Sequence, residues 1–203
     1  MLLCDIGNTS YHFFDGKRSY KKNVLDFNPQ EITQTVYFIS VNAKIKQNLS
    51  SLNNWLDLSV LVDMSPYYES MGVDRIFAIE ATSNAIIVDA GSAITVDVVK
   101  EGEFLGGFIY PGLKAMSSTY KNISPALEYE FNFDFDLNTL AKNSQDAISY
   151  GALKLLYSEV VSYNLPVLLT GGDAKSLKKI FKQARVDDKL IFKGMQELID
   201  KKL

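Results

Sequence analysis

Hydrophobic and polar positions follow the same order twice along this 203-residue chain. Residues 2–15 read LLCDIGNTSYHFFD, and residues 86–99 read IIVDAGSAITVDVV. In each segment an apolar run ends in an acidic residue, a glycine follows two positions later, and a partly alternating run returns after small residues. This pattern is typical of a strand, a tight turn and a second strand. The sequence therefore predicts two similar β-hairpins.

Strands and helices are expected to alternate over the rest of the chain. Four more apolar runs predict strands, at residues 35–41, 59–64, 165–173 and 190–193. Another strand is expected between the turn at 100–103 and Pro111. Helices are expected at 74–84, 112–120, 143–163, 175–185 and the C-terminus. The alternating phenylalanines of residues 128–136 indicate either an edge strand or flap, or side chains that pack on the core.

The two hairpin turns carry residue types that suit a phosphate and cation site. Gly7 and Gly91 tolerate positive φ and let backbone amides approach a ligand closely. Asp5 and Asp89 each place one carboxylate beside a turn, and carboxylate oxygens bind hydrated cations. A single Asp-x-Gly is an ordinary turn. Its recurrence at matching positions of two hairpins is what favours a ligand site.

Composition narrows the class of protein. A hydrophobic content of 47% is enough for one large domain or two small lobes. The formal net charge of −3 argues against a general cationic surface for nucleic acid. The basic run at 175–185 has Leu177, Ile180 and Phe181 at helical spacing, so its charged side chains are expected to form a solvated face.

The sequence also gives expectations about compartment and metal binding. The single cysteine, Cys4, lies in an apolar run and is expected to be a buried small hydrophobe. No basic, apolar leader and no apolar stretch of ~20 residues is present, which favours a protein of the reducing cytoplasm and no membrane span. With one histidine and one cysteine, a zinc site would need mainly carboxylates.

The duplicated hairpins resemble those of the actin, sugar kinase and heat-shock ATPase superfamily, and a late strand running into paired glycines adds to this resemblance. Five motifs occur in the order found in type III pantothenate kinases: DIGNT at 5–9, GVDR at 72–75, DAGSAITVD at 89–97, GGFIYPG at 106–112 and TGGD at 170–173. The resemblance implies an α/β fold of two duplicated ribonuclease-H-like lobes, residues 1–84 and 85–203, with a nucleotide cleft between them.

This resemblance implies roles for the GVDR segment. Asp74 is expected to be the catalytic base that accepts the proton of the pantothenate hydroxyl, and Arg75 to bind the substrate carboxylate with its planar fork. The alternatives are structural: a helix cap for Asp74 and a salt bridge for Arg75. Substrate-binding residues are expected among Tyr68, Gly72, Val73, Arg75 and Ser144.

The resemblance also implies how ATP and its ions are held. The ATP-binding and phosphate-binding residues are expected to be Asp5, Ile6, Gly7, Asn8, Thr9, Ser92, Gly171 and Gly172, with the last two facing the adenosine. Asp5 is expected to bind magnesium through the phosphates, and Asp89 a monovalent cation, K⁺ or NH₄⁺. Asp97 either takes part in the cleft or is a satisfied buried polar residue.

Three departures from the family pattern stand out. Ser92 and Ser144 each stand where the family usually has threonine, which keeps the hydroxyl. The loop before GVDR is shortened to residues 66–71, and spacing does not tell which of Tyr67 and Tyr68 faces the substrate.

The resemblance implies ATP-dependent phosphorylation of pantothenate to 4'-phosphopantothenate, the first step of coenzyme A biosynthesis, by a homodimer whose site is partly completed by the neighbour's helix. Two alternatives stay open. One is a kinase of another small hydroxy acid; the other is a nucleotide-binding accessory factor for transcription regulation without turnover. Intact Asp5, Asp74, Arg75 and Asp89 favour the enzyme, and no DNA-reading helix or basic arm is recognisable.

Overall fold

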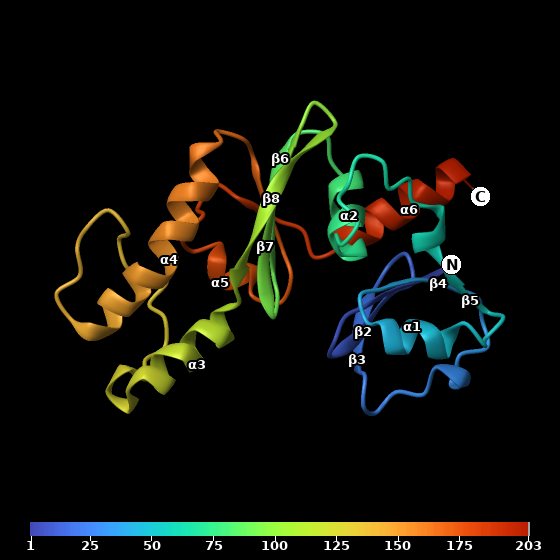
Figure 1. Ribbon diagram of the computed structural model, residues 1–203, viewed down its shortest axis with the longest axis horizontal. Coiled ribbons are helices and arrows are strands. Elements are labelled where there is room, and N and C mark those ends of the chain that lie inside the picture. The colour runs from blue at the N-terminus through green and yellow to red at the C-terminus, as the bar shows by residue number, and fades with distance from the viewer. Residues whose placement is uncertain (203) are drawn as a thin grey trace. The chain divides into compact units, whose positions relative to one another are not determined.

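The computed structural model describes residues 1–202 and divides the chain into two compact units. Unit 1 consists of Met1–Ala81 together with the segment that begins at Lys189, and unit 2 of Thr82–Asp188. The backbone therefore leaves unit 1, builds unit 2 and returns to unit 1 for its last helix. The elements of each unit are labelled in Figure 1.

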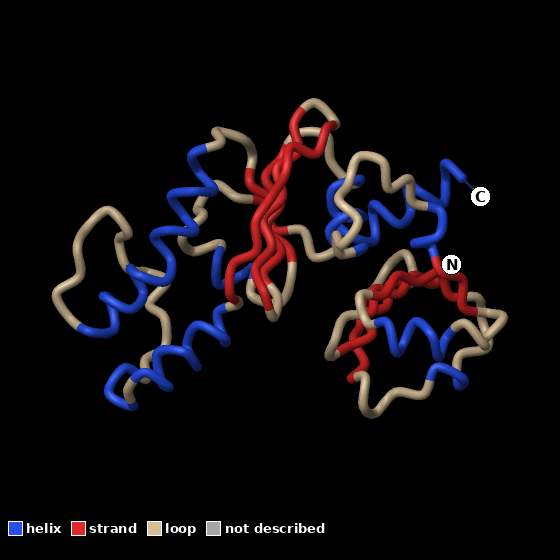
Figure 2. The backbone as a smooth tube through the Cα atoms, viewed as in Figure 1, coloured by secondary structure: helices blue, strands red, loops and turns tan. Residues whose placement is uncertain are grey.

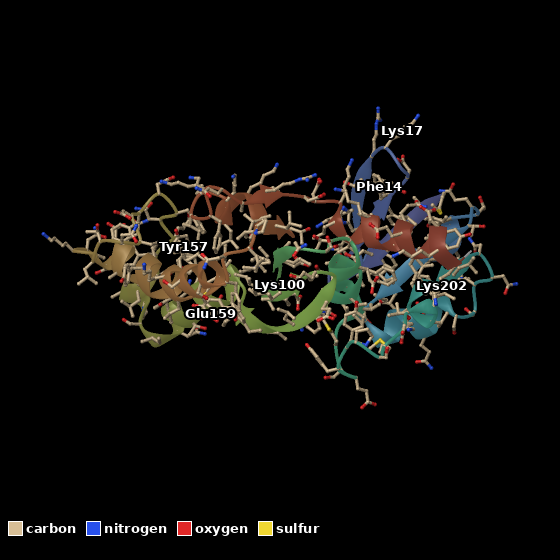
Figure 3. All side chains as sticks on the ribbon, turned by 90° about the horizontal axis from the view of Figure 1, so that it is seen from above. Phe14, Lys17, Lys100, Tyr157, Glu159 and Lys202 are labelled. Atoms are coloured by element: carbon tan, nitrogen blue, oxygen red, sulfur yellow. The ribbon has the colours of Figure 1, made fainter. Side chains whose placement is uncertain are left out.

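Unit 1 contains a five-stranded mixed sheet in the order β3-β2-β1-β4-β5. Its strands are β1 (Leu2–Ile6), β2 (Ser10–Phe14), β3 (Ser19–Asn23), β4 (Val36–Ser40) and β5 (Trp55–Asp57). The first three strands pair antiparallel, whereas β4 runs parallel to both β1 and β5. The turn between β2 and β3 carries Lys17 (Figure 3).

Unit 2 repeats this arrangement with a sheet in the order β8-β7-β6-β9-β10. Its strands are β6 (Ala85–Ala90), β7 (Ala93–Lys100), β8 (Glu103–Pro111), β9 (Val167–Thr170) and β10 (Arg185–Val186). Again the first three strands are antiparallel and the last two join in parallel. The predicted duplication of ribonuclease-H-like lobes is confirmed, and the two sheets are the red groups of Figure 2.

Helices cover the sheets of both units. They are α1 (Ala43–Leu49), α2 (Val73–Glu80), α3 (Leu113–Ile123), α4 (Ser144–Ser162), α5 (Ala174–Leu177) and α6 (Leu190–Lys202). In unit 1, α1 lies on one face of the sheet and α2 with α6 on the other; in unit 2, α3, α4 and α5 lie on one face (Figure 1). Within residues 1–202 no helix combines the length and apolarity needed to cross a bilayer.

The side chains of β1 point alternately to the two faces of the sheet and contribute to two separate hydrophobic cores in unit 1. Leu2, Cys4 and Ile6 point to the side covered by α1, where they join an aromatic cluster that includes Trp55. Leu3 points to the other side and packs with residues of α2 and α6. Side chains two positions apart share a face of a strand, which explains this division. Cys4 is fully buried, as predicted.

The core of unit 2 is built from the second hairpin and the long helix. Ile86 and Val88 of β6 and Val96 of β7 pack against Leu153 and Leu156 of α4, and all five are at most 1% exposed. Burying such side chains stabilises a fold by about 1.5–3 kcal/mol each. This cluster fixes the strand from which Asp89 projects.

Two predicted strands are wrong. Residues 58–61 form a 3₁₀ helix, η2 (Leu58–Leu61), because the Asp57 carboxylate accepts a hydrogen bond from the Ser59 amide at 2.8 Å and turns the chain after the short β5. Residues 190–193 begin α6, whose buried positions Leu190 and Gly194 are one helical turn apart. Apolar runs of four to six residues fit both the helical and the strand period, so the pattern alone did not identify the element.

Two further segments differ in part from expectation. Residues 128–136 form no strand; Phe131, Phe133 and Phe135 pack on the core of unit 2, which was the alternative. The helix predicted at 175–185 ends at Leu177, and Lys178 Nζ then donates to the carbonyls of Lys182 and Ala184, both at 2.6 Å, which holds the following turns. The remaining two 3₁₀ helices are η1 (Pro29–Glu31) and η3 (Pro125–Leu127).

Helix α6 belongs to unit 1 because it packs closely on α2. The sequence-based division assigned this segment to the second lobe. A Cβ built on Gly194 would lie 1.9 Å from the Phe77 carbonyl oxygen, so only glycine allows the two helices to approach this closely. Phe192 and Met195 on either side of Gly194 are buried in the cluster with Phe77.

We expect Gly194→Ala to lower the free energy of unfolding by about 1–3 kcal/mol, the usual cost of overpacking. Thermal unfolding of the purified variant measures this. Gly151→Ala is the matched control, because Gly151 is also helical but its Cβ would lie 3.4 Å from the Tyr120 hydroxyl. The control should be neutral or stabilised by helix propensity. Equal melting temperatures for Gly194→Ala and the wild type would contradict the close α2–α6 contact.

Candidate functional site

The first glycine turn lies at the carboxyl end of β1. The Gly7 amide donates to the Ser10 carbonyl at 3.1 Å and closes the turn, which leaves the side chains of Asn8 and Thr9 exposed. Asp5 is half-buried on β1, opposite His12 of β2. The Ile6 side chain is fully buried in the core, so a ligand at this turn can reach only its backbone.

Gly72 caps α2 and positions Asp74 in its first turn. Asp74 Oδ1 accepts a hydrogen bond from the Arg75 amide at 2.8 Å. A Cβ on Gly72 would lie 2.5 Å from that same oxygen, so any other residue at position 72 would displace the carboxylate. Asp74 is therefore not the N-cap of α2, and the space beside its carboxylate depends on a glycine.

Burial raises the pKa of Asp74 above the ordinary range of aspartate, and the Arg75 amide and guanidinium only partly offset this effect. Removing a carboxylate from water disfavours its charged form. The result is a carboxyl group that takes up a proton more readily than an exposed aspartate. Such a shift is typical of groups that exchange protons with a substrate.

The two tyrosines of the shortened loop take different partners. Arg75 is 6% exposed, and its Nη1 donates to the Tyr68 hydroxyl while the guanidinium lies 5.7 Å from the centre of that ring. The Tyr67 hydroxyl instead donates to Glu80 Oε1 at 2.7 Å, and burial followed by this hydrogen bond raises the Tyr67 pKa. Tyr68 thus contacts the predicted substrate arginine through both its hydroxyl and its ring. Nothing in the spacing pointed to the Tyr67–Glu80 pair.

The turn at Gly7 and the start of α2 lie at the same end of the unit 1 sheet. The Val41 amide donates to the Ile6 carbonyl at 3.2 Å, directly after the parallel strands β1 and β4 end. Val41 Cγ1 is in turn 3.9 Å from a Cβ built on Gly72. Ligands of sheets with parallel strands bind at the carboxyl ends of those strands. Unit 1 therefore gathers its two predicted motifs at one edge.

In unit 2, Asp89 lies against the paired glycines. Asp89 sits on the central strand β6, between Thr95 of β7 and Thr170 of β9. Gly171 has φ +86°, and a Cβ there would lie 2.3 Å from Asp89 Oδ1 and 2.6 Å from the Ala90 carbonyl oxygen. Both the backbone conformation and the close approach require glycine. A carboxylate oxygen of Asp89 and the carbonyl oxygen of Ala90 therefore both lie beside this turn.

The last glycine of the GGFIYPG motif, Gly112, packs against the turn of the second hairpin. A Cβ on Gly112 would lie 2.3 Å from the Ser92 carbonyl oxygen and 2.7 Å from that of Gly91. The Asp173 amide also donates to the Ala90 carbonyl at 2.9 Å. Three motifs that are far apart in the sequence thus form one cluster at one end of the unit 2 sheet. Gly172 has open space where a side chain would be.

Two other predicted residues have different surroundings. Asp97 is 1% exposed on β7, between Ile87 of β6 and Gly107 of β8, so it is a buried acid of the sheet. Ser144 is exposed at the first position of α4, where Asn143 caps the helix by accepting from the Asp146 amide at 2.9 Å. Among residues 1–202, no three acidic, histidine or cysteine side chains are grouped as a metal site.

The duplicated sheets and their acidic glycine turns define the class of protein, which is the actin-like ATPase and sugar kinase fold. An activator of 2-hydroxyisocaproyl-CoA dehydratase from Clostridium difficile, solved with ADPNP, has this fold. It is 13% identical, with a TM-score of 0.51 over 99% of this chain and 96% of its own. At that identity the similarity is one of fold alone.

The chain belongs to the type III pantothenate kinase family, whose model matches residues 28–163. A type III pantothenate kinase of Sulfurimonas denitrificans is 58% identical over 99% of this chain and 98% of its own length. A solved Campylobacter jejuni protein, assigned to the Baf family of transcriptional activators, is 35% identical with a TM-score of 0.88 and covers 99% of this chain and 98% of its own.

Proposed function

We propose that this protein transfers the γ-phosphoryl group of ATP to the hydroxyl of pantothenate and so forms 4'-phosphopantothenate, the first step of coenzyme A biosynthesis. Membership of the family supports the reaction. The observation that carries the proposal for the site is the geometry at the start of α2. There a partly buried carboxyl group with a raised pKa adjoins a buried arginine that is held by a tyrosine.

Asp74 would act at the attacking oxygen. It takes the proton of the pantothenate hydroxyl as that oxygen forms a bond to the γ-phosphorus and the bond to the β–γ bridging oxygen breaks, releasing ADP. Arg75, with Tyr68 fixing its guanidinium, would bind the pantothenate carboxylate and so position the hydroxyl. The backbone of Gly72 and Val73 would border the same substrate.

The glycine turns would hold the nucleotide. The Gly7 turn, closed by the hydrogen bond from the Gly7 amide to the Ser10 carbonyl, would present the backbone amides of Asn8 and Thr9 to phosphate oxygens. The hydroxyls of Thr9 and Ser92 would also donate to phosphate oxygens. The open space beside Gly172 suits a flat nucleoside. Magnesium would be bound mainly by the phosphates, with Asp5 nearby, where it offsets phosphate charge. Ile6 would contribute only through its backbone.

A monovalent cation, K⁺ or NH₄⁺, would be bound at Asp89. The residues present fit such an ion, because the Asp89 carboxylate and the Ala90 carbonyl converge where Gly171 lacks a side chain. Oxygen ligands of this kind suit hard cations. When bound, the ion would offset negative charge near the nucleotide.

The family resemblance also leads us to propose a cytoplasmic homodimer. Ser144 is exposed at the start of α4, and Leu155 of the same helix is 69% exposed. A second copy that covers this helix would bury that apolar side chain and bring Ser144 to the partner's pantothenate. Sedimentation equilibrium tests the oligomeric state.

An accessory factor that binds nucleotide without turnover is the second candidate, and the Baf-family name of the Campylobacter jejuni relative favours it. A coupled assay of ADP release separates the two functions. The kinase predicts pantothenate-dependent ADP release in the presence of potassium. Nucleotide binding without pantothenate-dependent release would favour the accessory factor, and release with other hydroxy acids but not pantothenate would indicate a different kinase.

The raised pKa of Asp74 predicts an acid limb in the pH profile. A raised pKa means that the carboxylate, which is the active form, is populated only at higher pH than for an ordinary aspartate of pKa ~3.9. The kcat/KM for pantothenate should therefore fall as pH decreases, with a midpoint above that value. Initial rates across the acidic range measure it. A flat profile down to the ordinary aspartate range would contradict Asp74 as the base.

Replacing potassium by sodium at constant ionic strength should raise the KM for ATP. The negative charge of Asp89 would oppose a polyanionic nucleotide bound at the turn of Gly171 and Gly172 unless a cation offsets it. Asp89→Asn should lose both activity and the discrimination between the two salts. Equal ATP kinetics in potassium and sodium would remove the monovalent-cation site and leave the kinase assignment unaffected.

A further inference from the structure

A cavity of about 950 Å³ lies in unit 2, away from every residue assigned above to ATP or pantothenate. Its walls come from α4, from the loop at residues 133–138 and from the turns at residues 179–184. Leu165, Pro166 and Val167 line it at the start of β9, whereas Gly171 follows the opposite end of that strand. Its volume lies at the upper end of the range for small-molecule pockets.

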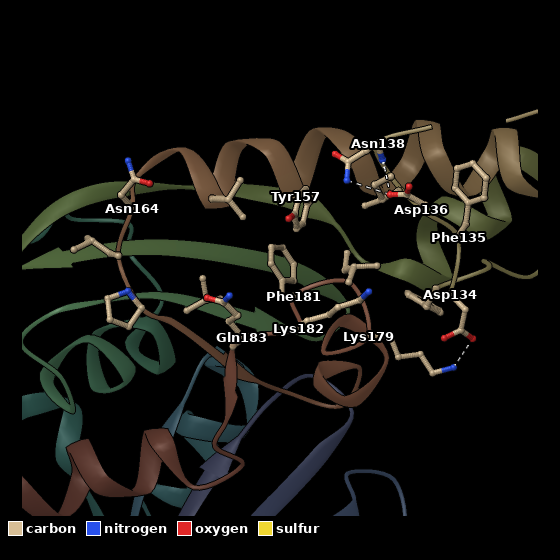
Figure 4. Close-up of a pocket in the computed structure, with 18 residues that line it drawn as sticks. Asp134, Phe135, Asp136, Asn138, Tyr157, Asn164, Lys179, Phe181, Lys182 and Gln183 are labelled. Carbon is tan, nitrogen blue, oxygen red and sulfur yellow. Dashed lines mark hydrogen bonds and ion pairs between the residues drawn. The ribbon is translucent and has the colours of Figure 1, made fainter. Parts of the chain in front are cut away.

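Two aromatic side chains form the floor of the cavity: Tyr157 is half-buried, and Phe181 beneath it is 3% exposed. The rings of Tyr157 and Phe181 are 5.5 Å apart and tilted by 35°. Tyr157 leaves α4 on a different side from the exposed Glu159, two residues further on (Figure 3). Figure 4 shows Asn164 at one end of the cavity and Asp134 at the other, with both rings between them. An elongated ligand with a flat apolar part fits this shape.

The acidic side chains of the cavity already have donors. Asp134 forms an ion pair with Lys179 at 2.9 Å. Asp136 accepts from the amide of Asn138 at 3.0 Å and from the Thr139 hydroxyl at 3.2 Å. The Asn138 amide, with these side-chain bonds and the charge of Lys182, lowers the Asp136 pKa. These carboxylates are therefore largely committed within the protein.

Lys179 and Asn138 are the donors to these carboxylates, and four other donor side chains of the cavity are not used in this way. Within residues 1–202, the exposed side chains of Asn164, Lys182 and Gln183 and the half-buried Tyr157 form no hydrogen bond or ion pair inside the protein. Lys182 faces the Asp136 charge, and Lys154 Nζ lies 5.8 Å from the centre of the Tyr157 ring. One ammonium group, two amides and a phenol thus remain to bind acceptor atoms. A ligand that supplies acceptors rather than donors would complement them.

We propose that this cavity is a second binding site, for a small organic anion with a flat apolar body. The apolar body would lie against Tyr157, whose ring packs on the buried Phe181, and the anionic group would reach Lys182 and the amide of Gln183. Carboxylate, sulfonate and phosphate ester groups share this chemistry. The site is separate from the proposed nucleotide and pantothenate residues.

Calorimetric titration with 8-anilinonaphthalene-1-sulfonate, a flat aromatic anion, tests the proposal on the full chain. Binding of one molecule per chain is expected, weakened about tenfold or more by Lys182→Glu, which reverses the charge at the anionic group. Val161→Trp should weaken it similarly by filling the cavity from α4. Lys175→Glu is the matched control: this exposed lysine of α5 does not line the cavity, so binding should be unchanged.

Saturating ATP with magnesium should not displace the probe, since the two sites share no residue. Circular dichroism melting of each variant confirms that it folds. Displacement by ATP, insensitivity to both cavity variants, or the absence of saturable binding would each overturn the proposal. None of these outcomes affects the kinase assignment, which the ADP-release assay tests separately.

Discussion

Asp74→Asn should lose most turnover while keeping its fold and its affinity for ATP. A positioned base contributes about 100-fold to 10,000-fold, and the amide cannot accept the pantothenate proton. The kcat with pantothenate should fall within this range, measured by ADP release at saturating substrates. Because burial raises the Asp74 pKa, the folded state disfavours the charged carboxylate. The neutral variant should therefore be at least as stable as the wild type at neutral pH.

Asp26→Asn serves as the control for this substitution, since Asp26 is an exposed residue of unit 1 outside both motifs. It should retain wild-type turnover. Near-normal turnover of purified Asp74→Asn would remove Asp74 from the mechanism. A loss of turnover accompanied by a lower melting temperature would instead indicate a structural role.

Arg75→Ala should mainly weaken the binding of pantothenate. Hydrogen bonds to a charged group contribute about 1.5–3 kcal/mol, so the KM for pantothenate should rise about tenfold to 100-fold. Pantothenol lacks the carboxylate, and its kinetics should change far less. Steady-state assays with both compounds measure the difference.

Arg185→Ala controls for the loss of an arginine, because Arg185 has a 73% exposed side chain on β10. It should leave both substrates unaffected. Equal losses with pantothenate and pantothenol in Arg75→Ala would show that the arginine supports the scaffold, for example by holding Tyr68, and does not bind the carboxylate.

The duplicated fold could be predicted because its signal is local and occurs twice. In the sequence, each hairpin is marked by an apolar run, an acidic residue and a glycine. The two sheets that contain these hairpins have equivalent orders of strands. The failures share a cause. At 59–64 and 190–193 the apolar runs are too short to distinguish the two periods, and a capping bond from Asp57 and packing on α2 decided the outcome.

The sequence proposes residues for the site but does not show their contacts. The family resemblance of the GVDR motif singles out Asp74 and Arg75, whereas the choice between Tyr67 and Tyr68 depends on where the loop places each hydroxyl. The pairing of Tyr67 with Glu80, thirteen residues away, follows from the fold of the loop onto α2. Likewise, the requirement for glycine at position 171 reflects Asp89, which no local pattern connects to it.

The most direct test of the proposed reaction identifies the molecule that receives the γ-phosphoryl group of ATP. The purified protein is incubated with ATP, magnesium, potassium and pantothenate, and the products are identified by ³¹P NMR and mass spectrometry, with Asp74→Asn in parallel. The proposal predicts a phosphate monoester with the mass of 4'-phosphopantothenate, formed in equal amount to ADP and nearly absent with the variant. No pantothenate ester, or ADP balanced only by inorganic phosphate, would contradict it.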